Sequence, residues 1–262
     1  MKRVLIFLFL GILSLSITGC AGRQSSARSS IEERFARGKA LFEKEKWARA
    51  ADEFNLVVIN NPAGNLAAQA QYYYAECLYQ QKQYVEAQVE FERLLRRWAT
   101  TEHLVEARYR IVQCLVAQSP SFYFDQKTTL EAIDELQAFI DDFPESAYRE
   151  EAETLITELR YKIARKYYES GRLYLKWRRS PPARIYFDMV LSQYYDTPYA
   201  DEARVGIVVS YILEEDLEAA RVYLNENDAK FTDPELRAEA ERYVDMAQQG
   251  KFDLDFYIRL YQ

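Results

Sequence analysis

Residues of fixed type recur at fixed spacing along most of this chain, and this repetition limits the fold more than any other feature of the sequence. In the segment ERFARGKALFEKEKWARAADEFNLVVINNP, Gly38, Ala50, Phe54 and Pro62 follow one another at gaps of 12, 4 and 8 residues. Small residues at Gly38 and Ala50 let two helices approach closely, and Phe54 is expected to fill the space beneath them. Pro62 ends the second helix, because proline lacks an N–H group and disfavours helix in the residue before it. The segment therefore predicts a pair of antiparallel helices.

The same spacing returns in four later segments. Alanine occupies the position of Ala50 in each, at successive intervals of 37, 45, 51 and 37 residues, and an aromatic or leucine side chain follows four residues later. This pattern is that of the tetratricopeptide repeat, whose standard length is about 34 residues, so the longer intervals indicate insertions. We predict an all-α tetratricopeptide solenoid of about five helix pairs. The later pairs of marker residues are Ala87 and Phe91, Ala132 and Leu136, Ala183 and Phe187, and Ala220 and Leu224.

Three features predict where the array departs from a regular repeat. The stretch SPSFYFDQKTT, Ser119 to Thr129, is expected to be a loop insertion. Residues 146–179 contain no proline and one glycine, which fits one long helix of about 50 Å between repeats three and four, at 1.5 Å per residue. A break near Gly171 is the alternative. Pro234 is expected to begin a last helix that caps the array.

The first 20 residues have the features of a signal peptide followed by a lipidation site. Lys2 and Arg3 precede an uncharged run of 14 residues, Val4 to Ile17. This run is shorter than the ~20 residues that cross a bilayer as a helix, so it fits a signal peptide. It leads into ITGC, whose order of apolar residue, small residue, glycine and cysteine is typical of a lipobox. We therefore predict a signal peptide over residues 1–19, cleavage before Cys20 and a diacylglycerol on the Cys20 thiol.

A lipidated flexible tether is predicted over residues 20–30, because AGRQSSARSS is small, polar and without periodicity. Ala21, rather than aspartate, follows the cysteine, which permits sorting to the outer membrane in bacteria with two membranes. Beyond the tether we expect repeats one to three over residues 31–145. Repeats four and five, with the long linking helix and the capping helix, are expected over residues 146–262.

Composition and motifs argue against nucleic-acid binding and catalysis. The chain has a formal charge of −7 at pH 7, whereas phosphate binding needs clustered lysine and arginine. His103 is the single histidine, and its position at the start of a helix suggests a solvated side chain. The sequence contains no glycine-rich phosphate loop, no G-x-S-x-G motif and no histidine–glutamate metal spacing. We therefore expect no enzyme activity, no cofactor and no metal site.

Cys77 and Cys114 are the cysteines beyond the lipobox, and they occupy equivalent positions on the first helices of successive repeats. Neighbouring helices lie about 8–10 Å apart, whereas a disulfide needs Cα atoms within about 7 Å. We therefore predict two free, buried thiols, even in an oxidising compartment.

The order of these features carries a more specific resemblance. A lipobox and a short tether lead into about five repeats with insertions in the third and fourth, and the chain contains FPESAY, KIARKYYESG and YYDTPYADEA. In these respects the mature chain resembles the BamD (ComL) family, lipoproteins of the outer-membrane β-barrel assembly machine. The resemblance implies a non-enzymatic scaffold, anchored by its lipid to the periplasmic face of the outer membrane. It would bind the periplasmic POTRA domains of BamA, other accessory lipoproteins and unfolded β-barrel proteins.

A first interaction surface is expected on the concave face of the repeats. First helices of tetratricopeptide repeats line that face at a few fixed positions, and aromatic residues at these positions are expected to bind extended segments of unfolded β-barrel proteins. The alternative is that the rings are partly core. These residues are Phe35 and Phe42 in repeat one, Tyr72 and Tyr79 in repeat two, and Tyr109 in repeat three.

A second surface, for BamA, is expected on the C-terminal repeats around Arg184, Tyr186 and Tyr195. The family usually carries an arginine at the position of Tyr186, and Arg184 cannot replace it, because residues two apart do not share a helix face. The alternative for these residues is packing between repeats four and five. Another class of function also stays open, since tetratricopeptide lipoproteins act in pilus or secretin assembly and in coordinating cell-wall synthesis.

Overall fold

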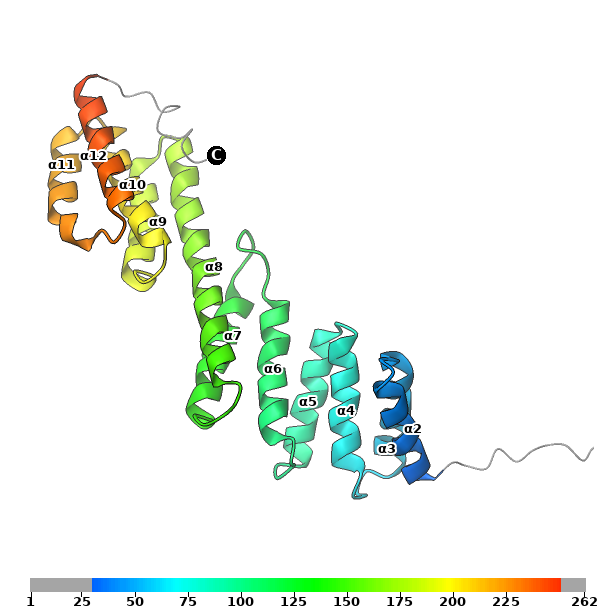
Figure 1. Ribbon diagram of the computed structural model, residues 1–262. Helices are drawn as coiled ribbons and strands as arrows, with labels where there is room; N and C mark the ends of the chain where they lie inside the picture. Colours follow the sequence, from blue (N-terminus) through cyan, green and yellow to red (C-terminus); the bar gives the residue numbers. More distant parts are fainter. Residues whose placement is uncertain (1–29, 251–262) are drawn as a thin grey trace, which may run out of the picture. The chain divides into compact units, whose positions relative to one another are not determined.

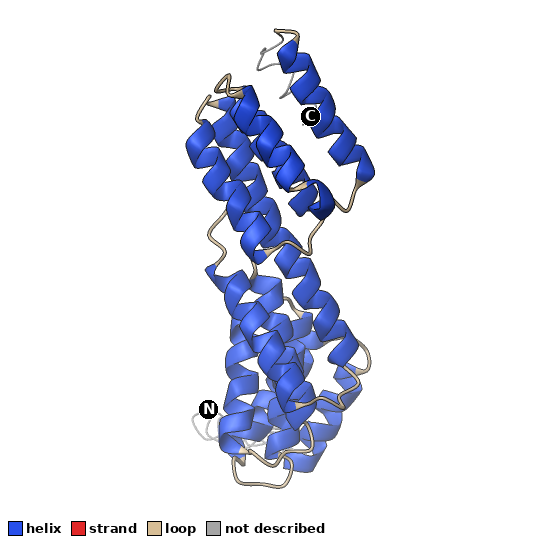
Figure 2. Ribbon diagram, turned by 90° about the vertical axis from the view of Figure 1, so that its left-hand side faces the viewer, coloured by secondary structure: helices blue, strands red, loops and turns tan. Residues whose placement is uncertain are grey.

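The computed structural model describes residues 30–250. The signal peptide, Cys20 and all of the tether except Ser30 lie outside the described residues, as do residues 251–262. Across the described part the chain is all-helical (Figures 1 and 2), which confirms the predicted fold class. It divides into two compact units, one ending at Tyr74 and the other beginning at Ala75.

The N-terminal unit contains α2 (Ile31–Phe42), α3 (Trp47–Asn60) and the first turns of α4 (Ala67–Gln80). Ser30 and Glu33 form a capping box at the start of α2, in which each side chain accepts a hydrogen bond from the backbone N–H of the other residue. These bonds satisfy two N–H groups that a helix start would otherwise leave free. The boundaries match the helix pair that the residue spacing predicts.

Close packing between α2 and α3 depends on Gly38. Phe54 and Ala50 are fully buried, and a Cβ atom at Gly38 would lie only 2.8 Å from the Phe54 ring. Any larger residue at this position would therefore push the ring or the helix away. This is the physical reason for the glycine, alanine and phenylalanine spacing in the sequence.

The C-terminal unit begins inside α4 and contains eight further α-helices and one 3₁₀ helix. Each successive pair from α5 to α11 packs in order, and α12 packs on α10 and α11. α12 begins at Pro234 as predicted, with Asp233 accepting hydrogen bonds from the backbone N–H groups of Glu235 and Leu236. The helices are α5 (Tyr84–Arg97), α6 (Leu104–Gln118), α7 (Lys127–Asp142), α8 (Arg149–Lys176), α9 (Ser180–Gln193), α10 (Tyr199–Ile212), α11 (Leu217–Glu226), the 3₁₀ helix (Asp228–Lys230) and α12 (Pro234–Gln248).

Four of the turns that join the two helices of a pair each contain a residue with positive φ. It stands two residues before the second helix in four pairs, with φ between 54° and 61°. Residues with side chains rarely adopt this conformation, so its recurrence marks one turn geometry used four times. Repeat three differs, because the insertion from Ser119 to Gln126 replaces the tight turn between α6 and α7. The four residues are Glu45, Lys82, Arg178 and Glu215.

α8 is one continuous helix of 28 residues, so the break near Gly171 does not occur. Gly171 is buried, and a Cβ atom there would lie 2.6 Å from the Phe187 ring of α9. The glycine therefore serves close packing of α9 on α8 rather than helix termination.

Candidate functional site

Tyr73 is the centre of an aromatic cluster in the N-terminal unit. Its ring stacks on Phe54 at 5.3 Å between centroids and makes edge contacts with Phe42 at 5.3 Å and Phe35 at 6.3 Å. The Nζ atom of Lys39 lies 3.8 Å from the centre of the same ring, a distance at which a cation is attracted to the ring face. Sequence reasoning missed Tyr73, because it stands one residue beyond a counted groove position.

The predicted groove residues of this unit are half-buried. Phe42 contacts Trp47 at 4.9 Å, and Tyr72 contacts Tyr73 at 5.4 Å. Phe35, Phe42 and Tyr72 therefore pack on their own unit on one side and reach solvent on the other. Rings placed in this way offer apolar surface in a fixed orientation.

In the C-terminal unit, Tyr79 lies beside an ion pair between the buried Glu76 and the half-buried Arg110. Glu76 is 4% exposed, and Arg110 donates two hydrogen bonds to its carboxylate, at 2.8 and 2.9 Å. Gln80 donates a third, at 2.8 Å. The Arg110 guanidinium lies 4.6 Å from the centre of the Tyr79 ring, which also contacts Tyr84 at 5.5 Å. Burial raises the pKa of the Tyr79 hydroxyl, so it stays a hydrogen-bond donor at neutral pH.

Tyr109 is buried, contrary to the expectation that its ring faces the groove in repeat three. Its side chain is 2% exposed, and its ring stacks on Tyr148 at 4.4 Å and contacts Phe139 at 5.3 Å. Tyr148 precedes the long helix α8, whose start covers the position. Burial also raises the pKa of the Tyr109 hydroxyl. The ring belongs to the core formed by α6, α7 and the first half of α8.

Arg184 joins repeat four to repeat five. Its guanidinium pairs with Glu214 at 2.8 Å, donates to the Ser210 hydroxyl at 3.1 Å and lies 4.5 Å from the centre of the Tyr211 ring. This is the packing alternative that the sequence left open. Removing the arginine would therefore act first on the contact between α9 and α10.

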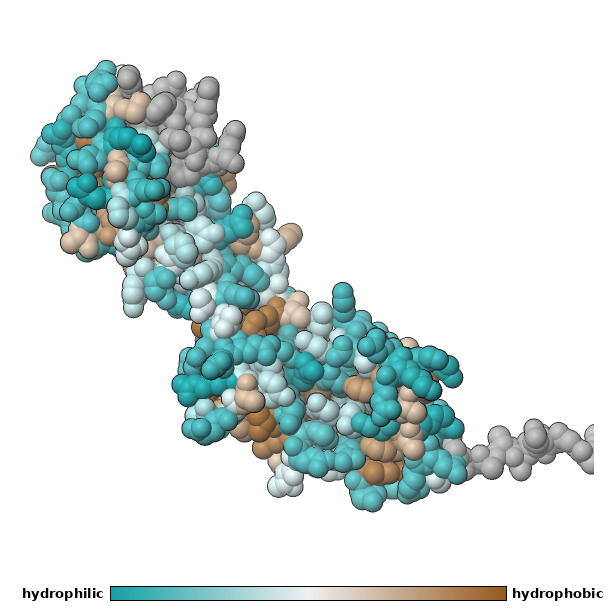
Figure 3. Space-filling view, viewed as in Figure 1, coloured by the Kyte–Doolittle hydropathy of each residue, from teal (hydrophilic) through white to brown (hydrophobic). Residues whose placement is uncertain are grey.

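Tyr186 instead lies in an aromatic patch formed by α8 and α9. Its ring stacks on Tyr174 at 5.4 Å, and Tyr174 contacts Trp177 edge-on at 5.6 Å. Trp177 is 60% exposed. We call Tyr174, Trp177 and Tyr186 the α8–α9 patch. Figure 3 shows that hydrophilic residues cover most of the face it draws, with hydrophobic residues only in small groups.

Tyr195 lies in the turn between α9 and α10 and is 68% exposed, whereas its neighbour Tyr194 is buried. The turn is held by Arg160, which pairs with Asp196 at 2.6 Å and donates to the backbone oxygen of Gln193. The structure thus gives the three predicted residues of this region different surroundings: Arg184 and Tyr186 are half-buried, and Tyr195 is exposed.

Two cysteines and one histidine are the remaining polar residues that the sequence singles out within residues 30–250. Cys77 and Cys114 are buried, free thiols, and burial raises the pKa of each to about 12. His103 is partly buried rather than solvated, with its side chain 18% exposed. No group of three or more His, Cys, Asp and Glu side chains in this range could hold a metal ion. None of the described helices is long and apolar enough to cross a membrane.

Comparison with known proteins decides the family. The family model for YfiO, described as an outer membrane lipoprotein, matches residues 28–221. The chain belongs to this family. Two relatives of the chain carry the name outer membrane protein assembly factor BamD. The one from Rickettsia prowazekii is 26% identical over 216 residues, and the one from Caulobacter vibrioides is 24% identical over 206 residues.

These alignments extend over most of each protein. They cover 81% of this chain and 86% of the Rickettsia relative, and 77% of this chain and 68% of the Caulobacter relative. The resemblance to BamD is thus confirmed. Among solved structures, YrrB, described as a tetratricopeptide repeat protein with an unusual peptide-binding site, is 19% identical with a TM-score of 0.34. That match covers 81% of this chain and 92% of YrrB.

Proposed function

We propose that this chain is a scaffold subunit of the outer-membrane β-barrel assembly machine, lipid-anchored at Cys20 to the periplasmic face of the outer membrane. The observation that carries the proposal is family membership together with two relatives named outer membrane protein assembly factor, aligned over 81% and 77% of the chain. The helix pairs support it, because stacked helical repeats provide extended surfaces for binding other proteins. The lipobox ITGC supports the anchor.

Unfolded β-barrel proteins are the proposed clients of the first helices. The accessible rings are Phe35, Phe42 and Tyr72 in the N-terminal unit and Tyr79 in the C-terminal unit. β-Barrel strands alternate apolar and polar side chains, and rigid rings bind apolar side chains with little loss of conformational entropy. The Glu76–Arg110 pair holds a fixed polar group next to Tyr79.

The periplasmic POTRA domains of BamA are the proposed partner of the C-terminal repeats, and other accessory lipoproteins are further partners. The α8–α9 patch supports this placement, because exposed tryptophan and tyrosine side chains are enriched among residues that dominate protein interfaces. Tyr195 adds a second exposed ring in the turn after α9.

Affinity purification of the full chain from native membranes tests the proposed function. We expect BamA and at least one other β-barrel protein of the outer membrane to co-purify. Recovery of a secretin, pilus assembly proteins or a peptidoglycan synthase, without BamA, would assign the chain to a different assembly process.

A photo-crosslinking residue at position 186 is expected to capture a POTRA domain of BamA. Tyr186→Ala combined with Trp177→Ala should reduce the BamA that co-purifies by about tenfold, in the range of aromatic anchors at interfaces. Val222→Ala is the matched control, because Val222 is also an exposed apolar residue of the C-terminal repeats. If a photo-reactive residue captured a POTRA domain only when placed in repeat one or two, and not at position 186, the placement would be contradicted.

Tyr79→Ala is expected to weaken binding of a peptide from the C-terminal strand of a β-barrel protein by about tenfold or more. Tyr72→Ala, tested separately, should act in the same direction. Fluorescence anisotropy measures the affinity, and circular dichroism of the same variants checks the fold. Tyr161→Ala, at an exposed tyrosine of α8, is the control. Unchanged affinity would remove these rings from the client site, and lost helicity would assign them to the core.

A further inference from the structure

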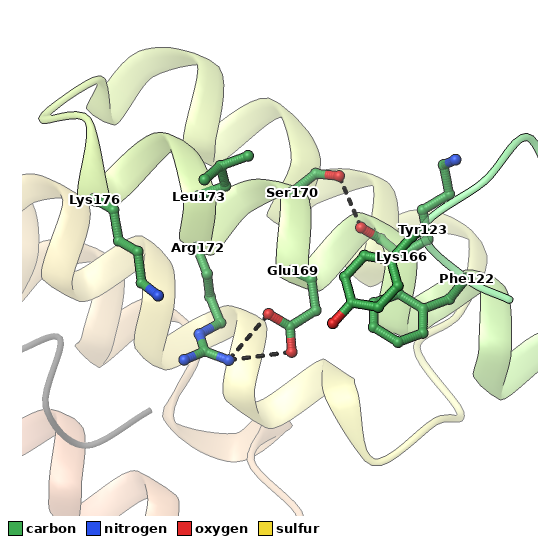
Figure 4. A pocket seen from close by; sticks show the side chains of 8 residues that line it. All are labelled: Phe122, Tyr123, Lys166, Glu169, Ser170, Arg172, Leu173 and Lys176. Carbon is green, nitrogen blue, oxygen red and sulfur yellow. Dashed lines mark hydrogen bonds and ion pairs between the residues drawn. The ribbon is translucent and has the colours of Figure 1, made fainter. Parts of the chain in front are cut away.

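A cleft of about 390 Å³ opens on α8 beside the loop insertion (Figure 4). Its apolar lining comes from Phe122 and Tyr123 of the insertion and Leu173 of α8. Tyr123 is 77% exposed and Leu173 is 44% exposed. Each side chain leaves part of its surface uncovered by the described part of the chain, so the cleft offers apolar surface to an occupant.

The cleft is built by fixed contacts between the insertion and α8. Lys162 donates to the Ser119 hydroxyl at 2.8 Å, and Lys166 donates to the backbone oxygen of Phe124 at 2.5 Å. The Arg165 guanidinium lies 4.2 Å from the centre of the Phe122 ring. Three cationic side chains from one stretch of α8 therefore hold the aromatic insertion in place.

The charged lining of the cleft has an excess of cations. Glu169 is its carboxylate, and Arg172 pairs with both of its oxygens at 3.0 and 3.1 Å (Figure 4). Lys166 and Lys176 also line the cleft, and neither forms an ion pair with any residue between 30 and 250. The chain as a whole carries a charge of −7, so the charge of this cleft is opposite in sign to that of the whole chain. Its chemistry fits a segment that combines aromatic side chains with carboxylates.

The end of this chain has that composition. Residues 251–262 read KFDLDFYIRLYQ, in which Phe252, Phe256 and Tyr257 supply rings, and Asp253 and Asp255 supply carboxylates. The stretch FDLDFY contains no cation. The tail therefore carries both of the chemical groups for which the cleft is suited.

The tail is also long enough to reach the cleft. α12 packs on α10, and α10 packs on α8, so two interhelical separations of about 8–10 Å each lie between α12 and α8. Twelve residues span up to about 40 Å when extended. This length covers the lateral distance and most of the length of a helix such as α10, which is about 21 Å at 1.5 Å per residue.

We propose that residues 251–262 dock in the α8 cleft of their own chain. The rings of the tail pack on Tyr123 and Leu173, and Asp253 and Asp255 pair with Lys166 and Lys176. The occupant is the tail of the same molecule, and a second copy or another protein is an alternative that the experiments separate.

Photo-crosslinking in the full chain gives the first test. A photo-reactive residue at position 123 is expected to crosslink to residues 251–262 of the same molecule, as read by mass spectrometry of the monomer band. The same residue at position 161, which is exposed on α8 but does not line the cleft, should give no such product. Crosslinks that join two copies, or a product without residues 251–262, would overturn the proposal.

Binding in trans gives the second test. A fluorescent peptide KFDLDFYIRLYQ is expected to bind a chain ending at Gly250 at least about tenfold more tightly than the full chain, because the attached tail competes at high effective concentration. Circular dichroism should show that the shortened chain keeps its helices, all of which end by Gln248. Equal affinity for both chains, or no binding to the folded shortened chain, would overturn the proposal.

Charge reversal identifies the contacts. Lys176→Glu in the shortened chain should weaken peptide binding about fivefold, since repulsion replaces attraction, and it leaves the bond from Lys166 to the insertion intact. Lys46→Glu, an exposed lysine of the N-terminal unit, is the matched control. A peptide in which only the carboxylate that faces Lys176 is reversed, by Asp253→Lys or by Asp255→Lys, should bind the Lys176→Glu chain more tightly than the unchanged peptide does. Equal losses in the two lysine variants, or no recovery with the altered peptide, would contradict the assigned pairing.

Discussion

Replacing Asp201 by alanine is expected to lower the free energy of unfolding by about 3–5 kcal/mol, the usual cost of removing one partner from a buried ion pair. Asp201 is 4% exposed, and its carboxylate pairs with Arg204 at 2.5 Å. It also accepts hydrogen bonds from the backbone N–H and hydroxyl of Thr232 and from the backbone N–H of Asp233, all within 2.8 Å. The variant leaves a buried arginine without its carboxylate and frees the segment that leads into α12.

The same carboxylate makes stability depend on pH. Burial alone would raise the pKa of Asp201, but the hydrogen bonds from Thr232 and Asp233 and the charge of Arg204 outweigh it and hold the pKa below its usual value. A carboxyl group with a lowered pKa in the folded state stabilises fully above its unfolded pKa of about 3.9. That contribution is lost as the pH falls through the lower pKa of the folded state.

Urea unfolding followed by circular dichroism measures both effects. The midpoint for Asp201→Ala should fall at pH 7, and the difference from the unchanged chain should shrink as the pH falls below about 4. Asp228→Ala is the control, because Asp228 pairs with Arg237 on the surface, where such pairs contribute about 0–1 kcal/mol. Equal changes in the two variants would show that the Asp201 network does not hold α12.

Replacing Phe187 by alanine is expected to cost about 3–5 kcal/mol, because it leaves a cavity in the core. The ring is fully buried and lies between two glycines, Gly171 of α8 and Gly206 of α10. A Cβ atom at Gly171 would lie 2.6 Å from the ring, and one at Gly206 would lie 2.5 Å from it. One side chain therefore fills the space that both glycines leave open.

Double variants separate this packing from helix propensity. Gly206→Ala alone should destabilise by about 1–3 kcal/mol through overcrowding, although alanine favours helix by about 1 kcal/mol over glycine. Gly206→Ala with Phe187→Leu should cost less than the sum of the single changes, since residues in contact are not additive. Additive losses would mean that the ring does not press on Gly206. Calorimetry or urea unfolding of the four chains gives the comparison.

Local signals in the sequence predict the helices well. Helical hydrogen bonds join residues four apart, so proline positions, small residues and the spacing of Ala50 and Phe54 carry much of the information for one helix pair. The start of α12 at Pro234 follows from the same local rule. Gly171 is the instructive exception: a glycine inside a long polar helix suggests a break, yet the Phe187 ring of another helix requires it there.

The candidate site was less predictable, because a position on a helix fixes the direction of a side chain but not what covers it. Tyr72 and Tyr109 occupy equivalent repeat positions, yet Tyr72 is half-buried and Tyr109 is enclosed by Tyr148 and Phe139. The difference arises from the longer repeat three and the helix that follows it.

The sequence by itself determined the all-helical repeat architecture, the loop insertion, the capping helix and the family, because each follows from short-range spacing or from an ordered set of motifs. Only the tertiary structure decided which groups meet. Glu76 and Arg110 are 34 residues apart, Arg184 and Glu214 are 30 apart, and Lys166 reaches back 42 residues to the insertion. Such contacts depend on how each helix pair packs against the next, and that packing is set by the volumes of many side chains together rather than by any one stretch of sequence.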